Sequence, residues 1–220
     1  MAKRDKQPGA VIPRVAASRL SRYLRHLEEL ERNGETTTSS QALGAALGVT
    51  AAQVRKDLGY FGQFGYPGLG YKISQLIPEV RRILGTDKVW NVALVGVGNL
   101  GTALLRYKGF ATHGFRIAAL FDSNEKLVGR SAEGIPVRHI DAISRVVPEE
   151  AIELAILCVP GEAAQAVADR LVAAGIRGIF NFAPTVISVG EDLSYASIDL
   201  ALELEQLSFA VTQREREVEP

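Results

Sequence analysis

A glycine-rich turn between a predicted strand and a predicted helix most constrains how this chain folds. The run from Lys88 to Val95 is mostly apolar and suits a strand buried in a parallel sheet. It passes directly into Gly96-Val97-Gly98-Asn99-Leu100-Gly101, and a helical stretch is predicted from Thr102 to Tyr107. In a G-x-G-x-x-G turn the first glycine permits the tight turn. The second lets the backbone approach a pyrophosphate, and the third lets helix and strand pack closely. The sequence therefore predicts a dinucleotide-binding domain.

An acidic residue follows this turn at the spacing expected for ribose recognition. The second predicted strand, 116–121, ends at Asp122, about 20 residues beyond Gly101. A carboxylate there accepts hydrogen bonds from the ribose hydroxyls and repels a 2′-phosphate, which favours NAD or NADH over NADP. Arg130 lies nearby in the sequence, so NADP remains the alternative. The predicted cofactor contacts at this end of the sheet are Gly96, Val97, Gly98, Asn99, Leu100, Gly101 and Asp122.

Strands and helices continue to alternate beyond Asp122. Strands are predicted at 135–137, 154–159 and 176–180, with helices at 141–146 and 161–174 between them. This order predicts an α/β fold with a doubly wound sheet, which is a Rossmann domain. Ligands of such sheets bind beyond the carboxyl ends of the strands. The candidates for the nicotinamide side are Cys158, Val159, Pro160, Asn181, Ala183 and Pro184, and ordinary loop packing is the alternative for each.

The first third of the chain predicts a helix-turn-helix. From Ser18 onward the apolar residues follow the helical spacing of one buried stripe, and Asn33-Gly34 ends this helix. A short second helix is predicted at 41–47. Thr50 and Gln53 fit a capping box, so a third helix begins at Thr50. The turn between the last two helices is as short as that of a helix-turn-helix.

The third helix has the features of a DNA recognition helix. Its apolar positions face the core, and its small and basic residues face outward, namely Ala51, Ala52, Arg55 and Lys56. Small residues let the helix approach the major groove closely, and the basic ones supply phosphate or guanine contacts. The stretch 62–71 is rich in glycine and aromatic residues and predicts a hairpin, the wing of a winged-helix domain. The alternative is an ordinary three-helix domain that the hairpin closes.

Net charge differs between the part of this 220-residue chain that holds the predicted helix-turn-helix and the part that holds the predicted Rossmann domain. Residues 1–85 carry 13 Lys and Arg against 7 Asp and Glu, a net charge of +6, and residues 86–220 carry −6. A basic module that meets a polyanion explains this split, with chance clustering as the alternative. The predicted parts are a DNA-binding domain with an N-terminal arm (1–85), a Rossmann domain (86–196) and a terminal helix (197–220).

The terminal helix is predicted to need a cover from outside its own domain. Leu200, Leu204, Leu207 and Val211 form one stripe, and further apolar residues lie on another side. A helix that is apolar on more than one face is buried on more than one side. A partner subunit is the expected cover, which predicts a homodimer. Packing onto its own sheet is the alternative.

Other features argue against an enzyme, an export signal and a membrane protein. The three histidines lie in different predicted elements, so no metal site and no catalytic pairing is expected. The single cysteine, the lack of an apolar signal sequence and the absence of any membrane-length apolar run predict a cytoplasmic protein. Two alternatives remain: a small NAD-dependent oxidoreductase, and a related regulator that binds CoA or another nucleotide.

In its motifs the sequence resembles the Rex family of bacterial redox-sensing transcriptional repressors. The resemblance is carried, along nearly the whole chain, by SRLSRYLRHLEEL (18–30), TAAQVRKDLGYFGQFGYPGLGY (50–71), LVGVGNLGTALLRYKGF (94–110), NFAP (181–184) and SIDLALELEQL (197–207). It implies a homodimer with an N-terminal winged-helix domain, a Rossmann domain and a C-terminal helix swapped onto the partner. It also implies that NADH binding releases the dimer from operator DNA, while NAD⁺ is compatible with DNA binding.

The resemblance also assigns residues. It implies DNA contacts at Thr50, Ala51, Gln53, Arg55, Lys56 and Tyr60, and at Phe64, Gly65, Gly68 and Gly70 of the wing. It implies that Arg25, Tyr107 and Asp199 exchange a salt bridge and hydrogen bonds between redox states. The family often has Phe after that aspartate, where this chain has Leu200. An aromatic plug between the nicotinamide sites is therefore not expected at this position.

Overall fold

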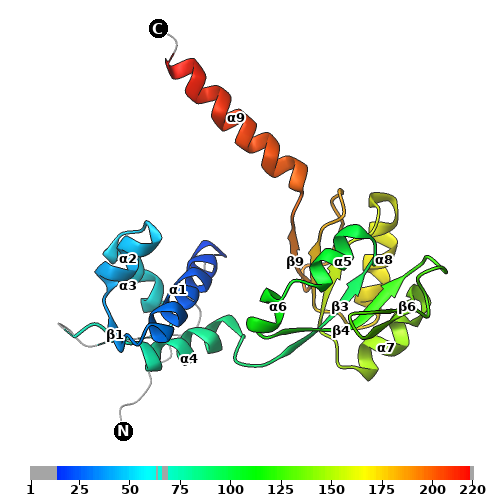
Figure 1. Cartoon of the computed structure of the whole chain (residues 1–220), viewed down its shortest axis with the longest axis horizontal. Coiled ribbons are helices and arrows are strands. Elements are labelled where there is room, and N and C mark those ends of the chain that lie inside the picture. The colour runs from blue at the N-terminus through cyan, green and yellow to red at the C-terminus, as the bar shows by residue number, and fades with distance from the viewer. Residues whose placement is uncertain (1–13, 63, 66–68, 219–220) are drawn as a thin grey trace. The chain divides into compact units, whose positions relative to one another are not determined.

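The computed structural model describes residues 14–62, 64–65 and 69–218. The chain divides into two compact units, Met1–Lys88 and Val89–Pro220 (Figure 1). This division lies close to the predicted boundary between residues 85 and 86. The terminal helix, which the sequence sets apart as 197–220, belongs to the second unit.

The first unit is a helical domain with its own core. Its helices are α1 (Arg14–Arg32), α2 (Ser40–Leu47), α3 (Ala51–Gly59) and α4 (Ile73–Leu84), and its strands are β1 (Thr37–Thr38) and β2 (Tyr71–Lys72). Each helix turns one apolar stripe inward, and the fully buried side chains include Leu20, Leu27, Leu43, Val54 and Ile73. Burial of such a side chain contributes about 1.5–3 kcal/mol. The predicted first three helices are therefore confirmed.

The fourth helix was not predicted, so the expectation of three helices was wrong. Residues Ile73, Leu76, Ile77 and Val80 are buried in α4, at the i, i+3, i+4, i+7 spacing that identifies a helix. The strand β2 just before it pairs antiparallel with β1, which lies between α1 and α2. Part of the predicted 62–71 hairpin, including Gly68, lies outside the described residues. The described pairing of β2 therefore involves a partner that the sequence did not suggest.

The second unit is built on a seven-stranded sheet in the described part of the chain, in the order β5-β6-β4-β3-β7-β8-β9. The strands are β3 (Trp90–Val95), β4 (Phe115–Asp122), β5 (Ser131–Ala132), β6 (Ile135–His139), β7 (Leu154–Leu157), β8 (Gly178–Asn181) and β9 (Ser194–Ser197). All neighbours are parallel except β5, which is antiparallel to β6. Without β5 this is the doubly wound Rossmann order, which confirms the predicted fold class.

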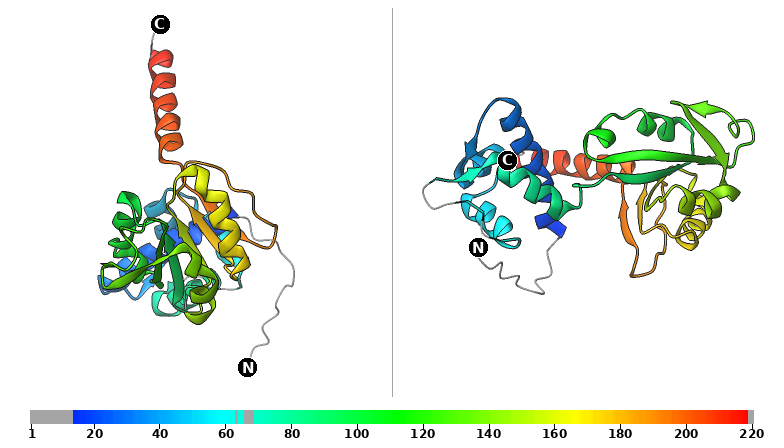
Figure 2. Two further views of the ribbon diagram at one scale, coloured as in Figure 1. Left: turned by 90° about the vertical axis from the view of Figure 1, so that its right-hand side faces the viewer. Right: turned by 90° about the horizontal axis from the view of Figure 1, so that it is seen from below.

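Helices cover both faces of this sheet (Figure 2). They are α5 (Asn99–Leu105), α6 (Gly109–Thr112), α7 (Ile143–Glu149) with the short 3₁₀ turn η1 (Ile140–Ala142) before it, and α8 (Gly161–Ala173). Along β3, Ala93 and Val95 belong to the core under α7 and α8, whereas Leu94 belongs to the core on the other face. A strand buried on both faces needs an unbroken apolar run, which is why the sequence shows one.

Some elements of the second unit differ from the prediction. Helix α5 begins at Asn99, inside the glycine motif, rather than at Thr102. The edge strands β5 and β9 were not predicted, because both are short and partly exposed and so lack a strong apolar pattern. Strand β9 lies parallel to β8 at the end of the sheet.

The terminal helix α9 (Leu200–Val218) leaves its apolar residues uncovered. Asp199 begins it by accepting hydrogen bonds from the backbone N–H groups of Ala201 and Leu202, at 2.9 and 3.3 Å. The large apolar side chains of α9 are 49–68% exposed, namely Leu200, Leu202, Leu204, Leu207, Phe209 and Val211. None of the helices in the described ranges combines the length and the apolar character needed to cross a bilayer.

Candidate functional sites: a recognition helix and a glycine-lined cleft

Local caps mark both ends of α2 and the start of α3. The Ser39 hydroxyl accepts a hydrogen bond from the Ala42 N–H at 3.0 Å, and Gly48 ends α2 in the left-handed conformation at φ 68°. Thr50 then accepts from the Gln53 N–H at 3.1 Å and begins α3. These caps confirm the predicted start of α3 and satisfy backbone groups that a helix end leaves free.

Helix α3 presents small and basic side chains to solvent. Ala52, Arg55 and Lys56 are exposed, and Ala51, Gln53 and Tyr60 are partly exposed. The Arg55 guanidinium donates a hydrogen bond to the Ser40 hydroxyl at 2.9 Å, which holds it against the start of α2. In the stretch after α3, Phe64 packs against the core and Gly65 has φ 85°. In the structure, the residues of α3 that are predicted to bind DNA are therefore exposed or partly exposed to solvent.

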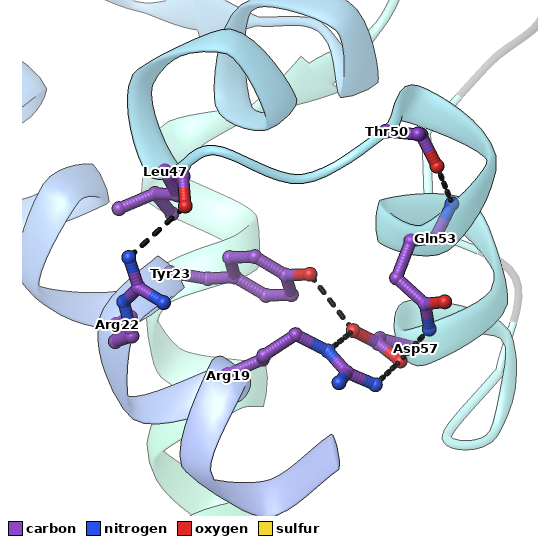
Figure 3. A network of polar contacts seen from close by, with 7 residues as sticks. All are labelled: Arg19, Arg22, Tyr23, Leu47, Thr50, Gln53 and Asp57. Carbon is purple, nitrogen blue, oxygen red and sulfur yellow. Dashed lines mark hydrogen bonds and ion pairs between the residues drawn. The ribbon is translucent and has the colours of Figure 1, made fainter. Parts of the chain in front are cut away.

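A buried carboxylate that the sequence analysis missed links α3 to α1 (Figure 3). Asp57 is fully buried. It accepts hydrogen bonds from Arg19 Nε and Nη2 at 2.5 and 2.7 Å, from the Tyr23 hydroxyl at 2.8 Å and from Gln53 Nε2 at 2.8 Å. Two features of the sequence could have indicated this network. Asp57 is a charged residue on the apolar face of α3, and Arg19 and Tyr23 lie one turn apart in α1.

The hydrogen bonds keep this carboxylate ionised. Burial alone would raise the pKa of Asp57, but the hydrogen bonds from Arg19, Tyr23 and Gln53 outweigh it and hold the pKa below its usual value. Burial and the hydrogen bond to Asp57 raise the pKa of Tyr23 to about 12. Gln53 donates a side-chain N–H to Asp57, and among the described residues no hydrogen bond joins its side chain to the Thr50 N–H, so the reciprocal half of the predicted capping box is not formed.

Gly96 and Gly98 of the glycine motif line a cleft of about 250 Å³ at the carboxyl ends of the central strands. Its walls are Gly96, Gly98, Asp122, Ser123, Asn124, Leu127, Ile140, Cys158, Val159, Pro160, Ala163 and Val167. Gly96 has φ 93°, and a Cβ atom there would collide with the carbonyl oxygen of Cys158. A Cβ at Gly101 would overlap the Gly96 carbonyl, whereas one at Gly98 would meet no atom within 4 Å. Two glycines thus allow the backbones to touch, and the third leaves the cleft open.

Asp122 stands at the end of β4 and is fixed by the backbone. Its Oδ2 accepts a hydrogen bond from the Val97 N–H at 2.7 Å, and its Oδ1 accepts one from the Asn124 N–H at 2.8 Å. Each carboxylate oxygen has a further lone pair for a ligand. The carboxylate is therefore oriented at the cleft wall before any ligand arrives.

The predicted contacts on the other side of the cleft fall into two groups. Cys158, Val159 and Pro160 line it. Burial raises the pKa of the Cys158 thiol to about 12, so it remains protonated at neutral pH and packs as a small apolar group. In the described chain, Asn181, Ala183 and Pro184 are not part of the cleft wall.

Asn181 has a structural role in this fold. It is fully buried, donates Nδ2 to the Thr185 carbonyl at 2.8 Å and accepts from the Ala183 N–H at 2.9 Å. Its side chain therefore shapes the loop that follows β8. Contact of Asn181, Ala183 or Pro184 with a cofactor stays a prediction.

Of the three residues predicted to couple the two domains, Arg25 lies in the first unit, and Tyr107 and Asp199 lie in the second. Arg25 is on the exposed face of α1, and Asp199 caps α9. Tyr107 is 56% exposed and packs edge-on against Phe110, with ring centroids 5.2 Å apart. Their exchange of partners stays a prediction.

Comparison with known proteins identifies the family. A family model described as "CoA binding domain" matches residues 87–185, and one described as "Putative DNA-binding protein N-terminus" matches residues 11–59. A protein of Carboxydothermus hydrogenoformans is 46% identical over 92% of this chain and 98% of its own length, and one of Thermus thermophilus is 48% identical over 91% and 94%. Both are named "Redox-sensing transcriptional repressor Rex". The chain belongs to the Rex family.

Solved structures of the Rex family agree along nearly the whole chain. One, described as RSP in complex with β-NAD⁺ and operator DNA, is 37% identical with a TM-score of 0.90 and covers 94% of this chain and 95% of its own. Another, described as RSP in complex with β-NADH, is 35% identical with a TM-score of 0.83 and covers 94% and 97%. The predicted family and the predicted combination of a DNA-binding domain with a Rossmann domain are thereby confirmed.

We expect Gly101→Ala to lower the free energy of unfolding of the second unit by about 1–3 kcal/mol, because its Cβ overlaps the Gly96 carbonyl. Trp90, the only tryptophan of the sequence, lies in β3 and reports on this unit by fluorescence during urea unfolding. Gly98→Ala is the matched control and should change stability by no more than about 0.5 kcal/mol. Equal losses in both variants would contradict the close contact at Gly101.

Asp57 is expected to make the stability of the first unit depend on acid pH. Because its pKa in the folded protein lies below the usual value of about 4, the unfolded chain binds a proton first as the pH falls. The stabilisation is complete above about pH 5 and is lost as the pH falls through the folded-state pKa. Urea unfolding followed by far-UV circular dichroism, with Trp90 fluorescence to separate the second unit, should show a weaker pH dependence in Asp57→Asn than in the wild type. The same dependence in both would contradict this role.

Proposed function

We propose that this protein is a redox-sensing transcriptional repressor that binds inverted-repeat operator DNA through α3 and releases it when NADH binds in the cleft of the second unit. One observation carries the proposal. The same chain holds a capped helix with exposed basic residues and a glycine-lined cleft with an oriented carboxylate. Relatives named as redox-sensing repressors, matched over more than nine-tenths of the chain, support it.

On the DNA side, α3 has the surface that a major groove accepts. Arg55 and Lys56 supply positive charge for phosphates or guanine, and Ala51 and Ala52 leave room for the helix to approach. Gly48 ends α2 and Thr50 begins α3, so the turn between the two helices is short. Solvent exposure of these side chains in the free protein means that they need no rearrangement of the core to reach DNA.

On the cofactor side, the residues present fit a dinucleotide. The open face of Gly98 allows a pyrophosphate to approach the backbone, and Asp122 has lone pairs for the hydroxyls of the adenosine ribose. The nicotinamide would then lie toward Cys158, Val159 and Pro160. NADH carries a neutral ring where NAD⁺ carries a charged one, so this side of the cleft would distinguish them.

Release requires that the cofactor discriminate between two states of the protein. NADH shifts the population only if it binds the DNA-incompetent state more tightly than the competent one. A change from 1:99 to 99:1 needs a difference of roughly 5.5 kcal/mol, which two cofactors in a dimer would share. Reorientation of the two recognition helices would change their spacing on a two-fold operator.

The homodimer in this proposal explains α9. Six large apolar side chains exposed on one helix form a surface that a soluble monomer does not ordinarily leave in water. A second copy of the chain is the proposed cover, in agreement with a two-fold symmetric operator.

The functional proposal predicts that a DNA duplex with the preferred inverted repeat is released on titration with NADH, but not with NAD⁺ or CoA. A mobility-shift assay with an inverted-repeat library measures this, and NADH fluorescence measures cofactor binding. CoA serves as the competitor because the matched family model carries its name, while Asp122 disfavours a 3′-phosphorylated ribose. A wild-type complex that is equally tight with and without saturating NADH would refute the proposed function.

The Arg25→Ala variant should bind the same duplex as the wild type but should remain bound to it when NADH is added.

The dimer proposal predicts that Leu204→Glu combined with Leu207→Glu converts the protein to a monomer, because two charges would enter the proposed interface. Sedimentation velocity gives the mass. Gln206→Glu, which adds a charge to the same helix without changing its apolar stripe, should remain dimeric. A dimeric double-glutamate variant would show that α9 is not the main contact.

A further inference from the structure

The side-chain amide of Gln53 has its orientation set by the buried carboxylate beneath it. Gln53 Nε2 lies 2.8 Å from Asp57 Oδ1. An ionised carboxylate only accepts hydrogen bonds, so the amide nitrogen and not the amide oxygen must face Asp57. The Oε1 atom of Gln53 therefore points away from Asp57 (Figure 3).

Asp57 cannot easily turn to release this amide. Arg19 binds both of its oxygens through Nε and Nη2, and the Tyr23 hydroxyl binds Oδ2 at 2.8 Å. Because Asp57 has no exposed surface, no water replaces these donors. Donors from α1 thus fix the Asp57 carboxylate, which lies one turn after Gln53 in α3.

Gln53 stands where a recognition helix meets bases. It is the third residue of α3, one turn before Lys56, and its side chain is partly exposed beside the exposed Ala52. The N-terminal residues of a recognition helix are those that contact base edges in the major groove. With one N–H held by Asp57, the side chain presents its remaining amide groups, Oε1 and the second N–H, in a predetermined orientation at this surface.

We propose that Asp57 is a positioning residue for base readout. It holds Gln53 so that Oε1 accepts a hydrogen bond from a base amino group at one base pair of each half-site. Such amino groups come from adenine N6 or cytosine N4 in the major groove. Adenine also offers N7 to the second N–H of the amide. The inference rests on the proposed function, because it requires α3 to enter the major groove.

The experiment compares operator discrimination in the wild type, Gln53→Met, Asp57→Asn and the double variant. Competition binding measures relative affinity for duplexes in which each base pair of the half-site is changed in turn to the other three. The base preferred at the affected position shows whether the amino group belongs to adenine or to cytosine. Gln53→Met should lose about fivefold to tenfold discrimination at one base pair and none elsewhere. Asp57→Asn should lose discrimination at that same base pair, and the double variant should lose no more than either single variant.

Glu28→Gln is the matched control. It makes the same change of carboxylate to amide on an arginine partner, Arg81 at 2.8 Å, but this pair links α1 to α4 and not to α3. Its base preferences should equal those of the wild type. Gln53→Glu tests the same contact from its other end: it keeps an acceptor oxygen but has no N–H for Asp57 and is repelled by that carboxylate, so it should lose discrimination at the same base pair.

Several outcomes would overturn the inference. One is a Gln53→Met variant whose base preferences equal those of the wild type. Another is a Gln53→Glu variant that still discriminates at the base pair in question. Losses at different base pairs in the two single variants, additive losses in the double variant, or an equal loss at every base pair in Asp57→Asn would also overturn it. Wild-type release by NADH, measured in the same assay, separates the two proposals. If the wild type binds operator and is released while Gln53 has no effect on base preference, only this inference fails.

Discussion

A carboxylate removed from water is the constraint on which the DNA-facing unit depends. An uncompensated buried charge costs several kcal/mol, so Asp57 is tolerated only where its donors converge. Those donors come from α1 and from the first turns of α3, which ties the two helices in one arrangement. Arg22 of α1 also donates to the Leu47 carbonyl at the end of α2, at 3.0 Å. Helix α1 therefore holds both helices of the helix-turn-helix through directed hydrogen bonds as well as apolar packing.

The second unit depends instead on glycines, which have no side chain and so let backbone segments come into contact. At Gly96 and Gly101 the backbones of β3, α5 and the segment after β7 come so close that no Cβ atom fits. In the same motif a Cβ atom at Gly98 would meet no atom within 4 Å, and the Val97 N–H donates a hydrogen bond to Asp122 Oδ2 at 2.7 Å. Close packing and an open binding surface are thus produced by one short motif, so a change that fills either contact would also disturb the cleft.

The sequence was informative wherever one segment determines its own structure. The glycine motif, the Asp122 spacing and the cap at Thr50 were predicted because local chemistry requires them. The Asp57 network was not, because its partners are distant in the chain and a charge on an apolar face looks like an error in the pattern. The position of Asn181 at the end of β8 was predicted, but the inward direction of its side chain depends on Thr185 and other groups that only the folded loop brings near.

Stiffness of the first unit matters for any signal that reaches it. Helix α1 carries Arg25 on its exposed face, while Arg19 and Tyr23 point toward α3. A helix joined to its neighbour only by apolar contacts could slide, because such contacts have no fixed direction. Hydrogen bonds to a buried carboxylate resist sliding, since each lost bond leaves a buried polar group without a partner. A change of partner at Arg25 that displaced α1 would therefore displace α3 as well, and the exposed residues of α3 would move as a group.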